Sequence, residues 1–190
     1  IICDVSTTDP DTIRRIGSAA QSKGVHVLDA PVSGGLEQRQ KGILSIMVGG
    51  DAKALDRAMP VFKAFGDKIF HAGDSGAGVT VKLVNNMLCG INMVATMEAL
   101  VLGVKGGLSV QTLKEVISAS SGSSRVFEGL VDTLTTRSPE PPPGETASMG
   151  LHTIVKDVRL AARLADELSV PLPIGSSAVQ LFVSGQPLAL

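Results

Sequence analysis

The sequence contains no tryptophan or tyrosine and only five phenylalanines among its 190 residues. Proteins that bind single-stranded nucleic acid stack bases on aromatic side chains, and proteins that bind duplexes carry clustered basic residues. Here 17 lysines and arginines are balanced by 18 aspartates and glutamates, so the formal net charge is −1. The lack of aromatic residues and of basic charge therefore argues against a nucleic-acid partner.

Cysteine is scarce as well, because Cys3 and Cys89 are the only two and form no C-x-x-C motif. Two cysteines cannot build the disulfide framework that small secreted domains rely on. We expect a reduced intracellular setting, namely the cytoplasm or, in a eukaryote, the mitochondrial matrix. No targeting segment is visible, and no metal site is expected.

Charge is low relative to apolar content, with 18% charged against 44% hydrophobic residues and a mean hydropathy of +0.29. Such surplus apolar surface predicts an interface, so we expect a homo-oligomer (a dimer or tetramer) or a missing partner domain. The chain opens at residues 1–5 (IICDV) with a strand pattern and no initiator methionine. This start predicts a fragment of a longer protein.

The first 75 residues alternate strand and helix signals, which is typical of an α/β sheet that is parallel at least in part. The expected strands are 1–5, 25–28, 43–48 and 68–71, the expected helices are 11–23 and 51–65, and 31–42 is expected to be a loop. Capping residues Asp9 and Pro10 precede the first helix, and Gly24 follows it.

Strand patterns end at His71, and residues 76–190 predict helices alone. These are expected at 79–104, 109–119, a short segment after Ser123 or Ser124, 150–168 and 174–183, with a proline-rich loop at 138–144. The predicted architecture is therefore the end of a Rossmann-like α/β domain, residues 1–75, followed by an all-helical domain, residues 76–190.

The predicted helix 79–104 is long enough to span a membrane, which takes about 20 residues. It carries five polar or charged residues, and such groups are costly in lipid: Lys82, Asn85, Asn86, Asn92 and Glu98. We therefore expect a central buried helix and no membrane partner.

Lys82 and Asn86 are four residues apart on that helix and share one face. A lysine in the first turns of a buried helix has its pKa lowered by the helix dipole and by desolvation. A lysine with a lowered pKa suits a general base acting on a hydroxyl group. From the residues alone, a Lys82 that extends to solvent and a structural Asn86 explain the pattern equally well.

Two further clusters carry candidate binding groups. Ser33, Gly34 and Gly35 follow a strand, where their hydroxyl and N–H groups can cradle a carboxylate, although an ordinary loop has the same composition. Lys156 and Asp157 lie on a late helix, where spacing alone predicts a solvated charge pair.

Together the segments 29–35 (DAPVSGG), 42–50 (GILSIMVGG), 73–78 (GDSGAG) with Lys82 and Asn86, and 156–161 (KDVRLA) resemble the β-hydroxyacid dehydrogenase family. Their order and spacing agree over nearly the whole chain. The resemblance implies a two-domain oxidoreductase that uses NAD or NADP to interconvert a 3-hydroxy acid and its semialdehyde or keto form. It makes Lys82 the catalytic acid/base and Asn86 its partner at the substrate oxygen.

By the same resemblance, Ser33, Gly34 and Gly35 bind the carboxylate of a small hydroxy-acid substrate. Thr7 is expected near the nicotinamide, Lys156 is expected to reach the cofactor, and Asp157 helps to fix it. The chain departs from the family in two ways. It has no G-x-G-x-x-G fingerprint, so about one hundred residues are expected before Ile1 and the isolated chain is expected to be inactive. Gln38, Arg39 and Ile43 replace smaller residues of the family loop.

The alternative is a non-catalytic helical dimerisation or interaction module, or a pseudoenzyme of the same family. Relatives that have lost catalysis are expected to lose the lysine, and imine-reducing relatives generally replace it. Both Lys82 and Asn86 are present here. Their presence favours the dehydrogenase.

Overall fold

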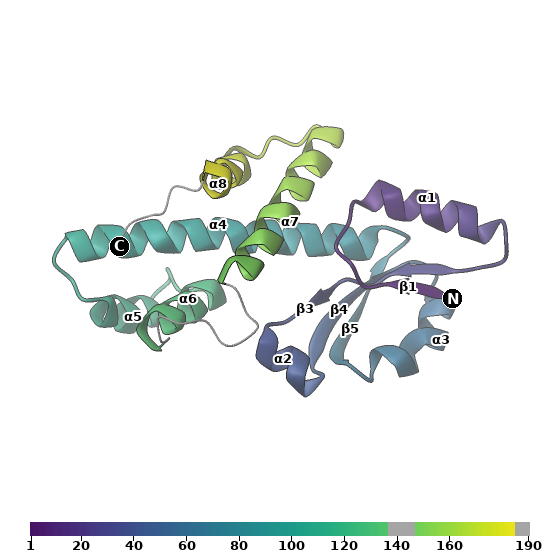
Figure 1. Ribbon diagram of the computed structural model, residues 1–190, viewed down its shortest axis with the longest axis horizontal. Coiled ribbons are helices and arrows are strands. Elements are labelled where there is room, and N and C mark those ends of the chain that lie inside the picture. The colour runs from purple at the N-terminus through teal and green to yellow at the C-terminus, as the bar shows by residue number, and fades with distance from the viewer. Residues whose placement is uncertain (137–146, 185–190) are drawn as a thin grey trace. The chain divides into compact units, whose positions relative to one another are not determined.

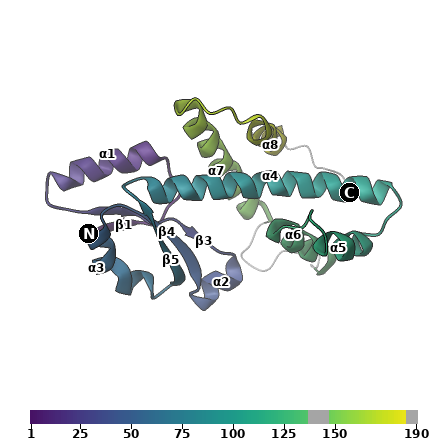
Figure 2. The same cartoon turned by 180° about the vertical axis from the view of Figure 1, so that it is seen from behind.

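The computed structural model describes residues 1–136 and 147–184, and the chain divides into two compact units, Ile1–Asn85 and Asn86–Leu190. The predicted proline-rich loop 138–144 lies outside the described residues. Figures 1 and 2 show the strands in the first unit and helices in the second.

The first unit is built on a mixed sheet. Its elements are β1 (Ile2–Asp4), α1 (Pro10–Gln21), β2 (Val27–Asp29), β3 (Val32–Ser33), α2 (Leu36–Lys41), β4 (Leu44–Gly49), α3 (Ala52–Phe62) and β5 (Gly66–Gly73). The strand order is β1-β2-β4-β3, with β5 also paired to β4. The pairs β1–β2 and β4–β5 are parallel, whereas β4 runs antiparallel to β2 and β3.

Helices α1 and α3 lie on opposite sides of this sheet (Figure 1). Both begin at an aspartate whose carboxylate accepts the backbone N–H three residues later, 2.8 Å from Asp9 to Thr12 and 2.8 Å from Asp51 to Ala54. The apolar face of α3 buries Phe62, which is 1% exposed, against the strands. The buried residues of α3 recur every three to four positions, which places them on one face of the helix.

Between Pro31 and Gly42 the prediction of a loop was wrong in part, because β3 and the six-residue α2 lie there. This short helix has no apolar periodicity from which it could be predicted. It begins at Gly35, whose N–H donates to Gln38 Oε1 at 3.0 Å, and it ends at Gly42 in the left-handed region, φ 66°. Local polar capping therefore forms this helix.

The second unit is helical wherever it is described. The long α4 (Ala77–Lys105) begins in the first unit and continues into the second, and α5 (Val110–Ser118), α6 (Arg125–Thr136), α7 (Ala147–Glu167) and α8 (Pro173–Ser184) follow. Its core joins three elements through Leu100, Leu113, Phe127 and Val131. As the sequence predicted, Ser109 caps α5, accepting the Thr112 N–H at 3.0 Å.

The expectation that the long helix is buried was wrong. Only 17% of the most apolar 18-residue window of α4 is buried, although its length and composition alone would suffice to cross a membrane. Exposed side chains include Val81, Val84, Leu88 and Leu102. The buried ones include the polar Lys82, Asn86 and Thr96 beside the apolar Val79, Leu83 and Leu100, so burial on α4 does not separate polar from apolar residues.

Candidate active site

The first turn of α4 is held on the sheet by backbone contact. A Cβ on Gly78 would lie 2.7 Å from the Asp29 carbonyl oxygen and 2.8 Å from the Gly49 nitrogen. Both distances are shorter than a real Cβ tolerates, so only glycine permits this approach. Gly76, just before the helix, has φ 87°, a conformation that other residues rarely adopt.

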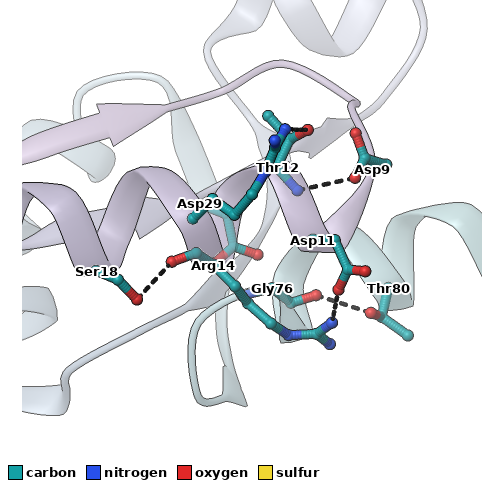
Figure 3. Close-up of polar contacts among 9 residues, drawn as sticks. Asp9, Asp11, Thr12, Arg14, Ser18, Asp29, Gly76 and Thr80 are labelled. Atoms are coloured by element: carbon teal, nitrogen blue, oxygen red, sulfur yellow. Dashed lines mark hydrogen bonds and ion pairs between the residues drawn. The ribbon is translucent and has the colours of Figure 1, made fainter.

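Asp29, at the end of β2, completes this junction. Its side chain is fully buried, and its carboxylate accepts the Gly76 N–H and the Val79 N–H, each at 2.8 Å. Figure 3 shows Asp29 beside Gly76, with the Thr80 hydroxyl donating to the Gly76 carbonyl at 2.7 Å. No sequence pattern predicts this role, because the partners are 47 and 50 residues apart.

Lys82 lies one turn beyond that junction, and Asn86 lies one turn further along the same face of α4. The Lys82 side chain is 8% exposed and that of Asn86 is 5% exposed. A lysine that simply extends to solvent would be more exposed than this. Burial of an amine disfavours its charged form, and only the neutral form can accept a proton.

Asn86 is fixed by a carboxylate on α7. Its Nδ2 donates to Asp157 Oδ2 at 2.5 Å, and Asp157 is fully buried. The other oxygen, Asp157 Oδ1, lies 2.8 Å from Lys156 Nζ, whose side chain is 51% exposed. The Lys156–Asp157 pair therefore combines a buried carboxylate with a half-exposed cation, and it is not the solvated pair that spacing alone predicted.

Ser33 is the last residue of β3, and Gly34 and Gly35 follow it directly. Gly34 has φ 153°, and a Cβ there would meet Leu44 Cδ2 at 2.5 Å, so the loop requires glycine at this position. The Gly35 N–H is already bonded to Gln38 Oε1. A carboxylate that uses this N–H must displace the Gln38 side chain, a competition that the sequence analysis did not foresee.

Thr7 lies between β1 and the cap of α1. Strands β1 and β2 are parallel, with Asp4 opposite Asp29, so the segments containing Thr7 and Ser33 both follow carboxyl ends at one edge of the sheet. Open α/β sheets bind ligands at this edge. The first unit contains Thr7, Ser33, Gly34, Gly35 and Lys82, and the second unit contains Asn86, Lys156 and Asp157, of which Asp157 contacts the other two.

The described residues fit part of a dinucleotide site. Thr7 offers a hydroxyl after the carboxyl end of a parallel strand, and Lys156 is a half-exposed cation held in place by a buried carboxylate. Both features suit a polar, phosphate-bearing cofactor. Among residues 1–136 and 147–184, no group of three or more histidine, cysteine, aspartate or glutamate side chains is placed to hold a metal.

Comparison with protein families matches both parts of the chain. Residues 76–188 match the family described as NAD-binding of NADP-dependent 3-hydroxyisobutyrate dehydrogenase. Residues 1–73 match the NAD binding domain of 6-phosphogluconate dehydrogenase. The two matched segments together span nearly the whole chain.

Curated relatives agree with these matches. The 2-(hydroxymethyl)glutarate dehydrogenase of Eubacterium barkeri is 38% identical over 100% of this chain and 62% of its own length. The 3-hydroxyisobutyrate dehydrogenase of Pseudomonas aeruginosa is 42% identical over 96% of this chain and 61% of its own length. The chain thus spans about three fifths of the length of these relatives.

Solved structures show the same fold. The Mycobacterium tuberculosis 3-hydroxyisobutyrate dehydrogenase with L-serine matches with a TM-score of 0.80 and 34% identity, covering 96% of this chain and 63% of that one. A Salmonella typhimurium 3-hydroxyisobutyrate dehydrogenase matches with a TM-score of 0.82 and 30% identity, covering 96% and 62%. A Rossmann-like unit followed by a helical unit, as the sequence predicted, is the architecture shared with them. The chain belongs to the β-hydroxyacid dehydrogenase family.

Proposed function

We propose that the protein of which this chain is part is an NAD(P)-dependent oxidoreductase that interconverts a small 3-hydroxy acid and its semialdehyde or keto form. The observation that carries the proposal is the burial of Lys82 at the start of α4, on the same face as a buried Asn86. Members of the family named above as dehydrogenases support the reaction class.

In this proposal Lys82 is the general acid/base. In the oxidation direction its amine accepts the hydroxyl proton as the carbon–oxygen double bond forms, and in reduction its ammonium returns the proton to the oxygen. Asn86, fixed by Asp157, orients the substrate oxygen toward Lys82. When bound, the nicotinamide cofactor supplies the hydride chemistry, and the protein supplies orientation and proton transfer.

Binding roles follow from the same arrangement. Ser33, Gly34 and Gly35 hold the substrate carboxylate through a hydroxyl and backbone N–H groups, in competition with Gln38 for Gly35. Thr7 contacts the nicotinamide end of the cofactor. Lys156 contacts the cofactor with its cation, and Asp157 positions Lys156 and Asn86 together.

The proposed domains are 1–75, the last part of the Rossmann-like domain, and 76–190, the helical domain. The family matches at 1–73 and 76–188 support a boundary at this point. The two compact units are divided ten residues later, at Asn85, inside α4. Because α4 runs through both units, the two boundaries differ only in the position along this helix at which the chain is divided.

We also propose a homo-oligomer, a dimer or a tetramer, that uses α4. The exposed residues Val81, Val84 and Leu88 follow the three-four spacing of a helix-packing seam, and the exposed Leu102 lies two heptads beyond Leu88. A second copy of this chain would cover them. We place the protein in the cytoplasm or, in a eukaryote, the mitochondrial matrix, in keeping with relatives that are bacterial and mitochondrial.

The test is nicotinamide absorbance in the protein expressed with any residues that precede Ile1. NAD or NADP would be offered with 3-hydroxyisobutyrate, glycerate, threonate and 4-hydroxybutyrate. Lys82→Ala is expected to lower turnover about a hundredfold or more, the scale of a lost general acid/base. The matched control is Lys105→Ala, since Lys105 is an exposed lysine at the far end of the same helix and should leave turnover unchanged.

Normal turnover in Lys82→Ala would contradict the catalytic assignment. Cofactor binding without turnover of any of the acids would favour the non-catalytic module or pseudoenzyme.

A further inference from the structure

We infer that Asp29 is a positioning residue for Lys82, and this inference rests on the proposed function of Lys82. The juxtaposition that carries it is a fully buried carboxylate at the end of β2 whose two oxygens hold the Gly76 and Val79 N–H groups at the start of α4.

A helix begins with N–H groups that lack partners inside the helix. An N-terminal serine or aspartate usually supplies the acceptor, but the residue before α4 is Gly76, which has no side chain. Asp29 supplies two acceptors from a different element. Its negative charge also lies at the positive end of the dipole of a 29-residue helix, which stabilises this placement.

The junction leaves the carboxylate little room to move. A Cβ on Gly49 would lie 2.5 Å from Asp29 Oδ1, so the carboxylate fits here only because residue 49 is glycine. The backbone of Asp29 is fixed as well, opposite Asp4 in β1 and opposite Gly49 in β4. The Asp29 side chain therefore fixes the start of α4 relative to β1, β2 and β4.

Asp29 also fixes two parts of the candidate site to each other. It lies four residues before Ser33, and the intervening backbone is held by a bond from the Met47 N–H to the Pro31 carbonyl at 3.0 Å. Val79, which it holds, lies three residues before Lys82. A change at Asp29 therefore alters where the Lys82 amine lies relative to the segment that receives the substrate carboxylate.

The experiment is a double-mutant cycle between Asp29→Asn and Lys82→Ala, measured by turnover in the protein with any residues that precede Ile1. Asparagine keeps the size of the side chain but replaces one acceptor oxygen with an NH₂ group that faces a backbone N–H. We expect Asp29→Asn to lower kcat about tenfold or more, with cofactor Kd changed less than about twofold. In the Lys82→Ala background the same change should lower kcat by less than about twofold, because its effect acts through the lysine.

The matched control is Asp51→Asn. Asp51 caps α3 with the same 2.8 Å bond geometry, and the candidate site does not include it. We expect this variant to lower the melting temperature while leaving kcat unchanged. Equal losses of kcat from Asp29→Asn in both Lys82 backgrounds would make Asp29 merely structural, and an unchanged kcat would overturn the inference outright.

If Asp29→Asn does not fold, Thr80→Val replaces it in the cycle, since the Thr80 hydroxyl holds the Gly76 carbonyl at the same junction. A loss of kcat that depends on Lys82 supports the inference, and no such dependence overturns it. A Lys82→Ala variant with normal turnover contradicts the proposed function instead, so the two failures are distinguishable.

Discussion

Replacing Asp157 with asparagine tests how much the buried anchor of the second unit contributes to stability. The wild-type carboxylate is fully buried, accepts the Asn86 amide and pairs with Lys156. Removing one partner of a fully buried ion pair costs about 3–5 kcal/mol. Lys156 is 51% exposed and turns to water when its partner is lost, so that figure does not apply in full.

Asparagine keeps one carbonyl oxygen that can accept the Asn86 amide, so that bond loses only its charge, whereas the new NH₂ group is a buried donor in place of the oxygen that faced Lys156. An unsatisfied buried donor costs about 1–3 kcal/mol. For a chain of this size each kcal/mol lowers the melting temperature by about 2–4 °C. We therefore expect Asp157→Asn to lower the midpoint by several degrees.

Thermal unfolding followed by circular dichroism measures this effect, since the chain has no tryptophan to report by fluorescence. The matched control is Asp132→Asn, which removes an ion pair to Lys114 whose carboxylate is 55% exposed. An exposed pair contributes about 0–1 kcal/mol. Equal shifts in the two variants would refute the reasoning that burial makes Asp157 costly to change.

Three other substitutions test separate features. Gly78→Ala places a Cβ 2.7 Å from the Asp29 carbonyl, so we expect a loss of about 1–3 kcal/mol in urea unfolding, and an unchanged midpoint would contradict the close backbone approach. Gln38→Ala frees the Gly35 N–H, so we expect a lower KM for the hydroxy acid with cofactor KM unchanged, and a raised substrate KM would contradict the competition. The pKa of Asp9 is lowered from its ordinary value because the side chain and backbone N–H of Thr12 donate to it. Its stabilisation is therefore present above the unfolded pKa of about 3.9 and is lost as pH falls through the lower folded pKa, so Asp9→Ala should cost about 1 kcal/mol at pH 7 and less under strongly acidic conditions.

The sequence predicted several helices closely, including α4, whose apolar residues are spread around the helix instead of following one face. The boundaries expected for 79–104, 109–119 and 174–183 lie within two residues of α4, α5 and α8. The segment 31–42 was not predicted correctly, since α2 has six residues and is formed by polar capping at Gly35 and Gly42. A helix that short has no periodicity to detect.

The residues of the candidate site could be predicted from the sequence, but the residues to which they hydrogen-bond could not. Lys82 and Asn86 share a helix face by spacing alone. That Asn86 bonds to Asp157, 71 residues away, and that Asp29 holds the start of α4 depend on tertiary packing. The burial of α4 was also misjudged, because an apolar sequence does not reveal whether its own chain or a second copy covers it.

The contact of Gly78 with the backbone of β2 and β4 has an evolutionary consequence. Because a Cβ at Gly78 would meet the backbone of these strands, no larger residue fits at this position, and the first turn of α4 is fixed next to the sheet. Gln38 and Arg39 on α2 take no part in this contact. Under the proposed function, a change in that short helix would alter which acid is accepted while the proposed proton-transfer group keeps its position.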